Sequence, residues 1–142
     1  MSQWIEFVSA SPMLSCAWVV LFGMLIYSFF SAKMRGFALV NAQEVVQLIN
    51  REDAVVIDVR SIDAFRRGHV AGAKNLQISK IEQNPKTALE KHSSHPIILV
   101  CETGAASLKA AALLHKSGVK SVCALRGGMN EWLQANLPTV SK

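Results

Sequence analysis

The chain has 142 residues, 51% of them hydrophobic, and a formal net charge of +5 at pH 7. Its length is that of about one domain, so a large multidomain architecture is excluded. Basic residues are scattered over the C-terminal two thirds with acidic residues between them, and this pattern predicts no nucleic-acid partner.

An uncharged N-terminal segment predicts one membrane-spanning helix. No residue between Glu6 and Lys33 is charged, and residues 13–30 form a continuous, largely apolar run. As a helix this run would be roughly 27 Å long, close to the ~30 Å hydrocarbon thickness of a bilayer. A cleaved secretory signal is the alternative, but no Lys or Arg precedes the run and no clean small-x-small site follows it. We therefore expect a short tail, residues 1–12, followed by an anchor.

Basic residues flank this run only on its C-terminal side. Lys33 and Arg35 lie in a predicted linker, residues 31–36, and the segment before the run contains no Lys or Arg. Because positively charged flanks remain in the cytoplasm, we expect a single-pass protein with its N-terminus outside and residues 37–142 in the cytoplasm.

The remaining sequence alternates between predicted strands and helices. Strands are predicted at 37–40, 54–59, 74–77, 97–100 and 121–125. Helices are predicted at 42–50 with Asn41 as N-cap, after Ser79 as a possible cap, at 85–91, at 108–116 and at 128–135. Strands joined by helical crossovers imply an α/β fold in which a parallel five-stranded sheet carries helices on both faces.

Cys101 is the candidate nucleophile of the chain. The loop that follows it consists of Glu102, Thr103, Gly104, Ala105, Ala106 and Ser107. Free N–H groups of such a loop and the positive end of the following helix favour a thiolate. The alternative is that Cys101 only closes the strand as a small apolar residue. The other two cysteines, Cys16 and Cys123, show no pairing or zinc-ligand spacing with it, so we expect a reducing compartment and no metal.

Two polar residues are expected beside Cys101. Ligands of open parallel sheets collect at the carboxyl ends of the strands, and Asp58 and Arg60 follow the second predicted strand as Cys101 follows the fourth. These side chains should pair with each other or with loop amides, and Asp63 offers Arg60 a further partner. We expect Asp58 and Arg60 to brace the loop and not to react.

Two stretches on either side of Cys101 resemble the signatures of the rhodanese-like domain family. Residues 56–76, VIDVRSIDAFRRGHVAGAKNL, resemble the first signature, and residues 125–132, LRGGMNEW, resemble the second. Cys101 lies where the persulfide cysteine of that family lies. The resemblance covers about residues 37–137 and implies the rhodanese-like fold. With the apolar segment in front, the whole chain is similar to bacterial membrane-anchored single-domain rhodaneses. This resemblance implies that the protein is located in the inner membrane.

This resemblance implies sulfur transfer. The thiolate of Cys101 would accept sulfane sulfur from thiosulfate or a protein persulfide, form a cysteine persulfide, and pass that sulfur to a thiol or to cyanide. The loop of residues 102–107 would bind the substrate and hold the negative charge of the sulfur. No metal or organic cofactor is needed.

The loop departs from the family pattern at two positions. Many active members carry arginines in this loop, whereas this chain has Glu102 and Ala106 there. At ~5 Å and an effective dielectric near 20, an acid repels each unit of negative charge on a donor by roughly 3 kcal/mol, and by much less if it points into water. We therefore expect thiosulfate to be a poor donor. Phosphatase chemistry is excluded because Ser107 stands where an arginine would have to clamp the phosphoryl group.

Two functional classes stay open at this point. The first is a membrane-tethered sulfurtransferase that acts through Cys101. The second is a catalytically weak rhodanese-like module that docks a protein partner at the inner membrane. The intact cysteine and its small loop favour the first class, and the missing arginines and the anchor favour the second. A membrane-protein partner bound through residues 13–30 is compatible with either.

Overall fold

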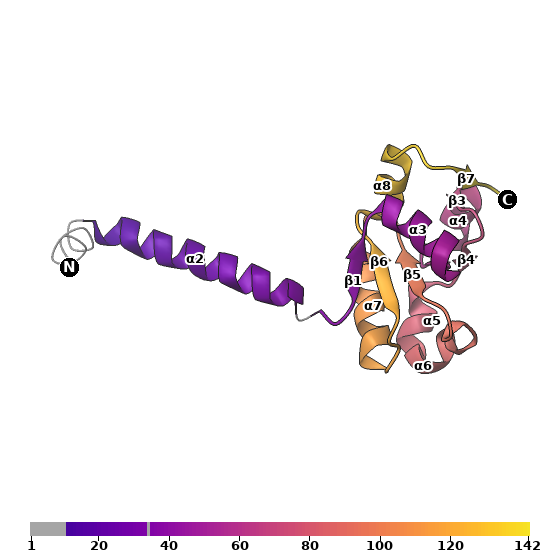
Figure 1. Cartoon of the computed structure of the whole chain (residues 1–142), viewed down its shortest axis with the longest axis horizontal. Helices are drawn as coiled ribbons and strands as arrows, with labels where there is room; N and C mark the ends of the chain where they lie inside the picture. Colours follow the sequence, from indigo (N-terminus) through magenta and orange to yellow (C-terminus); the bar gives the residue numbers. More distant parts are fainter. Residues whose placement is uncertain (1–10, 34) are drawn as a thin grey trace. The chain divides into compact units, whose positions relative to one another are not determined.

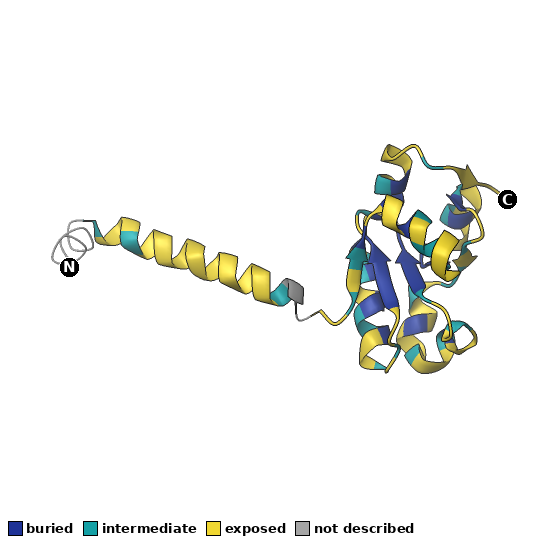
Figure 2. Cartoon of the chain, viewed as in Figure 1, coloured by how far each residue is buried: buried dark blue, intermediate teal, exposed yellow. Residues whose placement is uncertain are grey.

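A computed structural model describes residues 11–33 and 35–142 and divides the chain into two units, Met1–Arg35 and Gly36–Lys142. The first contains the helix α2 (Pro12–Lys33), whose large apolar side chains are exposed (Figures 1 and 2). By length and composition, its segment Pro12–Ser31 is able to cross a membrane. The helix continues into the segment expected to be a linker. Most of the predicted tail, residues 1–10, lies outside the described residues.

The second unit is built on a five-stranded sheet. In spatial order its strands are β1 (Ala38–Val40), β6 (Val122–Leu125), β5 (Ile97–Val100), β2 (Val55–Asp58) and β4 (Lys74–Asn75). Every neighbouring pair is parallel, which confirms the predicted α/β architecture. Strands β5 and β6 are buried at every position, as expected of strands covered on both faces.

A second, two-stranded sheet was not predicted from the sequence. Its strands β3 (His69–Val70) and β7 (Thr139–Val140) pair antiparallel. Each is two residues long, which is too short to give an alternating pattern. The pairing connects the C-terminal segment to the residues that follow the helix α4 (Ile62–Arg67).

The helices of the second unit differ from the prediction in number and in some of their boundaries. They are α3 (Ala42–Glu52), α4 (Ile62–Arg67), α5 (Ile78–Gln83), α6 (Pro85–Ala88), the 3-10 helix η1 (Glu90–His92), α7 (Ala105–Lys116) and α8 (Gly128–Gln134). The capping box of α3 is present, since Asn41 and Glu44 each bond the other's main-chain N–H. Ser79 is not a cap, because α5 already begins at Ile78. Helix α4 was not predicted, and the predicted helix 85–91 is divided into α6 and η1.

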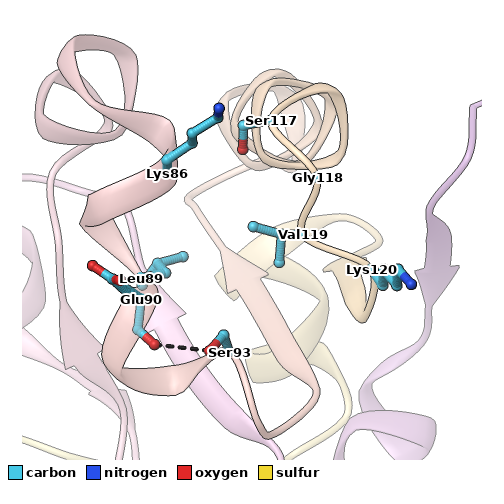
Figure 3. Close-up of a pocket in the computed structure, with 8 residues that line it drawn as sticks. All are labelled: Lys86, Leu89, Glu90, Ser93, Ser117, Gly118, Val119 and Lys120. Carbon is cyan, nitrogen blue, oxygen red and sulfur yellow. Dashed lines mark hydrogen bonds between the residues drawn. The ribbon is translucent and has the colours of Figure 1, made fainter.

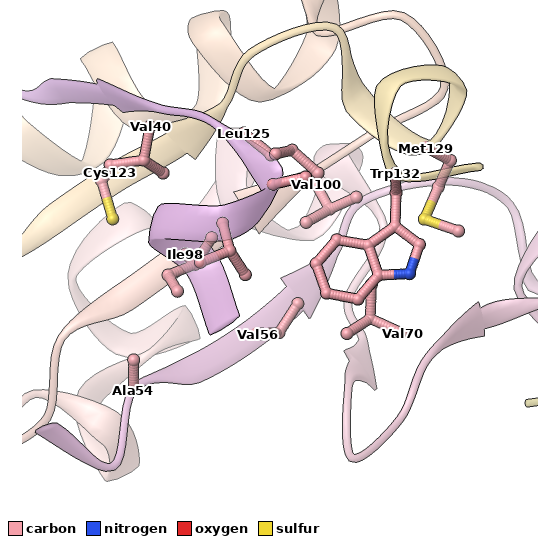
Figure 4. Packing of buried hydrophobic residues seen from close by; sticks show 12 residues of the cluster. Val40, Ala54, Val56, Val70, Ile98, Val100, Cys123, Leu125, Met129 and Trp132 are labelled. Atoms are coloured by element: carbon pink, nitrogen blue, oxygen red, sulfur yellow. The ribbon is translucent and has the colours of Figure 1, made fainter. Parts of the chain in front are cut away.

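Hydrophobic clusters fill both faces of the sheet. Alternate residues of β5 point to opposite faces, so Ile98 belongs to one cluster and Ile97 to the other. The first cluster includes Met129 and Trp132 of α8, as Figure 4 shows, and Trp132 is 3% exposed. The second includes Leu114 of α7. Both faces of the sheet are thus covered by hydrophobic clusters, and all members of these clusters belong to residues 36–142.

Candidate active site

Cys101 lies at the carboxyl edge of the sheet, directly after β5. Helix α7 begins at Ala105, three residues earlier than predicted, and Gly104 is its N-cap with a left-handed φ of 99°. An added Cβ at Gly104 would lie 3.2 Å from the main-chain nitrogen of Gly127, so this tight turn requires glycine both for its φ and for the close approach. The turn returns the chain over the cysteine within three residues.

The sulfur of Cys101 faces into this turn. The N–H of Gly104 donates to Cys101 Sγ at 2.9 Å, and Sγ lies 3.4 Å from Ser107 Oγ. The hydroxyl of Ser107 in turn donates to the carbonyl of Gly104 at 3.0 Å. The thiol therefore meets a main-chain N–H as expected. Among the described loop residues, Gly104 is the one whose N–H donates to the sulfur.

The loop residues differ in exposure. Cys101 is 3% exposed and Ser107 is fully buried. Glu102, Thr103 and Ala105 are exposed, Gly104 is buried and Ala106 is intermediate. The sulfur of Cys101 thus lies beneath a rim of exposed residues.

Helix α8 holds the loop from its other side. The N–H of Met129 donates to the carbonyl of Cys101 at 2.7 Å, and the N–H of Asn130 donates to that of Glu102 at 3.2 Å. These are first-turn N–H groups without partners inside their own helix. Gly128 has a φ of 59°, and an added Cβ there would lie 2.3 Å from the carbonyl oxygen of Cys101. The Gly-Gly turn therefore lets α8 approach the loop backbone.

Arg60 connects three parts of the site. Its Nε and Nη2 donate to the two carboxylate oxygens of Asp58 at 3.0 and 2.7 Å, Nη2 also donates to the carbonyl of Gly68 at 2.7 Å, and Nη1 donates to Glu102 Oε2 at 3.1 Å. Burial lowers the pKa of Arg60, but its bonds to Asp58 and then to Glu102 outweigh burial and raise the pKa overall. The predicted bracing pair is present, and the described contacts of Arg60 do not include Asp63.

Glu102 points outward from the loop. Its side chain is 60% exposed and pairs with Arg60, whose other partner, Asp58, is 1% exposed. One guanidinium thus serves two carboxylates, and this three-residue group carries one net negative charge beside the sulfur. The partner of Glu102 could not be found in the sequence, because the two residues are 42 positions apart.

Two further residues shape the site and were not among the candidate site residues chosen from the sequence. Asn75 Nδ2 donates to the carbonyls of Asp58 and Arg60 at 3.1 and 2.9 Å and so fixes the end of β2. His69 Nδ1 lies 2.8 Å from the carbonyl of Phe65, and its ring stacks on that of Phe65 with 3.8 Å between centroids. Both residues lie in the stretch 56–76 that resembles the first family signature, and this resemblance was the signal that could have identified them.

A cavity of about 240 Å³ adjoins the loop at Glu102. Its walls include Arg60 and Met129 and a second cation, Arg67, which is exposed at the end of α4. Among the described residues, Arg67 forms no ion pair. The cavity thus offers one available positive charge beside the loop.

Comparisons with known proteins agree with this geometry. A family model described as the rhodanese-like domain matches residues 41–135. The chain is 38% identical over 140 residues to the protein YibN of Escherichia coli K12, covering 99% of this chain and 98% of YibN. It is 30% identical over 93 residues to the thiosulfate sulfurtransferase GlpE of Pseudoalteromonas translucida, covering 66% of this chain and 86% of GlpE.

A solved structure shows the same fold in a protein of domain size. The crystal structure of a rhodanese-related protein from Thermoplasma volcanium superposes with a TM-score of 0.65 and 24% identity. The match covers 75% of this chain and 100% of that chain. Because 75% of this chain matches the whole of that solved chain, the fold forms in a chain of domain size.

Proposed function

Because the chain belongs to the rhodanese-like domain family, we propose that Cys101 is the nucleophile of a membrane-anchored sulfurtransferase. The thiolate attacks the sulfane sulfur of a donor, a new S–S bond forms, and the bond between that sulfur and the rest of the donor breaks. With thiosulfate the leaving group is sulfite. The resulting persulfide then passes its outer sulfur to a thiol or to cyanide and regenerates Cys101.

The contact between Gly104 N–H and Cys101 Sγ carries this proposal. A main-chain N–H directed at sulfur stabilises a thiolate more than a thiol, as does the start of the twelve-residue helix α7. Ser107, whose Oγ is 3.4 Å from Sγ, positions the sulfur and is itself held by the carbonyl of Gly104. Asp58 and Arg60 support the loop without reacting. We propose no metal or organic cofactor for this chemistry.

We propose a persulfide or a small thiol-bound sulfur compound as the preferred donor. Thiosulfate is a dianion, and the group of Asp58, Arg60 and Glu102 carries a net negative charge near the loop. The GlpE relatives are named thiosulfate sulfurtransferases, which supports the reaction class. The difference proposed for this chain lies in the donor and follows from Glu102.

We propose that residues 13–30 anchor the domain in the bacterial inner membrane. The uncharged segment Pro12–Ser31 supports a single span. Lys33 and Arg35 follow this span, so the positive-inside rule places the C-terminal domain in the cytoplasm and the N-terminus outside. A reducing cytoplasm keeps Cys101 available as a thiol.

Persulfide formation on the isolated domain tests the catalytic proposal. Incubation of residues 36–142 with a persulfide donor is expected to add the mass of one sulfur, and Cys101→Ala is expected to abolish this gain. Cys123→Ala is the matched control, because burial, and then Glu52 and Glu44, raise the pKa of Cys123 to about 11 and keep it a thiol. Intact mass spectrometry decides the question. A gain that persists in Cys101→Ala would exclude Cys101 as the acceptor.

Removing the charge of Glu102 is expected to improve the use of thiosulfate. In Glu102→Gln the repulsion of the dianion decreases and Arg60 Nη1 loses its carboxylate partner, so we expect thiosulfate-dependent sulfite release to rise about five-fold. The rate with an uncharged persulfide donor should change little. Glu52→Gln, an equal charge change at the other end of the sheet, is the control. An unchanged rate in Glu102→Gln would show that this acid does not face the donor.

The burial of Cys101 favours a second candidate function. At 3% exposure the thiol is poorly accessible to a donor, which suits a docking module that binds a protein partner in the membrane or at its surface. The persulfide experiment separates the two functions. A docking module would leave Cys101 unmodified by both thiosulfate and a persulfide donor while the domain remains folded.

A further inference from the structure

A cavity at the amino-terminal edge of the sheet, opposite Cys101, is not used by the proposed chemistry. Its volume is about 340 Å³, and its wall is formed by the α6–η1 segment and the residues that follow α7 (Figure 3). Leu89, which is 3% exposed, and the partly buried Val119 give it an apolar floor. Lys86 and Lys120 are exposed and lie on either side of Val119 in Figure 3.

Positive charge gathers around this cavity. Residues 84–96 precede β5 and residues 115–121 precede β6, and because these strands are parallel both segments lie at the same edge of the sheet. Together they contain one acid, Glu90, and four exposed lysines. We call these lysines the basic edge: Lys86, Lys91, Lys116 and Lys120. The two segments around the cavity are therefore basic, although Glu52 and Asp53 precede β2 at the same edge of the sheet.

His92 reports the same positive potential. Burial first, and then the charges of Lys74, His95 and Lys91, lower its pKa. Lys74 Nζ lies 3.4 Å from His92 Nε2. Cations on both sides of an imidazole disfavour a further positive charge, as they would favour an anion.

The hydroxyl groups in the cavity do not provide free donors. Ser93 donates its hydroxyl to the carbonyl of Glu90 at 2.9 Å, a bond drawn in Figure 3, and Ser117 donates to that of Leu114 at 2.8 Å. An anion at this edge would therefore be held by lysine ammonium groups, which act as point charges. That arrangement suits a layer of many anions better than one enclosed ion.

The chain also enters the domain at this edge. Gly36 begins the second unit, and its main chain lies so close to His115 that an added Cβ would overlap the imidazole ring. His115 belongs to the last turn of α7. Residues 34 and 35 connect this point to α2 in the sequence. The segment that leads into β1 therefore reaches the sheet at the same edge as these lysines.

We propose that the basic edge binds the headgroup phosphates of anionic phospholipids through its lysine ammonium groups. Each lysine near an anionic bilayer surface contributes favourably to binding, and the effect is screened by salt. The inference rests on the proposed membrane anchoring but not on the chemistry of Cys101. Such binding would direct the sulfur site, at the opposite edge of the sheet, away from the lipid.

Vesicle binding by residues 36–142 tests this inference without α2. The domain is expected to sediment with phosphatidylcholine vesicles that contain phosphatidylglycerol and not with phosphatidylcholine alone. Lys86→Ala combined with Lys120→Ala should weaken the partition coefficient about 30-fold. Raising the salt concentration to about 1 M, where the Debye length is about 3 Å, should release the domain.

The control is a double variant with the same loss of charge at the other edge. Arg66 and Arg126 are exposed and follow β2 and β6, and Arg66→Ala with Arg126→Ala should leave binding within about two-fold. Equal losses in both double variants, or equal binding to neutral vesicles, would overturn the proposal. The proposal would also be overturned if inorganic phosphate, but not chloride at the same ionic strength, released the domain from the vesicles. The ligand would then be a free anion. Cys101→Ala should bind as the unmodified domain does, so loss of sulfur transfer and loss of lipid binding are separate results.

Discussion

Replacing Gly128 with alanine is expected to damage the domain and its sulfur site together. An added Cβ would lie 2.3 Å from the carbonyl oxygen of Cys101 and 2.7 Å from that of Glu102, and both are main-chain atoms. The φ of 59° adds about 1–2 kcal/mol of strain for a residue with a side chain. We expect a total loss of about 3–5 kcal/mol in the free energy of unfolding. Urea unfolding followed by the fluorescence of Trp132 measures it.

Gly72→Ala separates the backbone strain from the steric clash. Gly72 has a φ of 78°, similar to that of Gly128, but no heavy atom lies within 4 Å of its added Cβ. This variant should lose only about 1–2 kcal/mol and should keep normal persulfide formation. Gly128→Ala should also lose persulfide formation under conditions where it is folded, because α8 can no longer hold the loop. Equal behaviour of the two variants would refute this role of Gly128.

Replacing Arg60 with methionine is expected to cost about 3–5 kcal/mol of folding free energy. Asp58 is 1% exposed, and Arg60 is its salt-bridge partner at 2.7 Å. Without Arg60 the buried carboxylate loses its bidentate partner, and removal of one member of a buried pair is strongly destabilising. The same urea experiment on residues 36–142 measures the loss.

A double variant identifies the buried charge as the cause. Asp58→Asn combined with Arg60→Met removes both charges, and we expect it to recover most of the stability lost in Arg60→Met. Glu102→Gln breaks the other ion pair of Arg60, but Glu102 is 60% exposed, so this change should cost less than about 1 kcal/mol. If the double variant were no more stable than Arg60→Met, the loss would come from the missing bond of Arg60 to the carbonyl of Gly68.

The parts of the fold that were predicted correctly have local signals. The buried strands β2, β5 and β6 are short apolar runs, and the capping box of α3 involves residues three positions apart. Their order along the chain, with helices between them, implied the parallel sheet. The parts that were missed lack such signals. Helix α4 has six residues, and β3 and β7 have two each, so none of them shows a full period of hydrophobic residues.

The candidate site also has features that could be predicted from the sequence and features that could not. Cys101, its loop and the neighbouring Asp58 and Arg60 were found in the sequence, because residues at the carboxyl ends of adjacent parallel strands must lie close together. The pairing of Arg60 with Glu102 and the bonds from α8 to the loop were not found. They join residues that are far apart in the sequence, and no local pattern encodes them.

The sequence alone determined the family, the order of most elements and the choice of Cys101 as the candidate nucleophile, because each of these depends on residue types at short spacing. The tertiary structure decided the electrostatic environment of that cysteine. Only the packing of α8 and β2 against the loop shows that one N–H meets the sulfur and that one guanidinium is shared by two carboxylates. Charge and hydrogen bonding act over a few ångströms in space, whatever the separation along the chain.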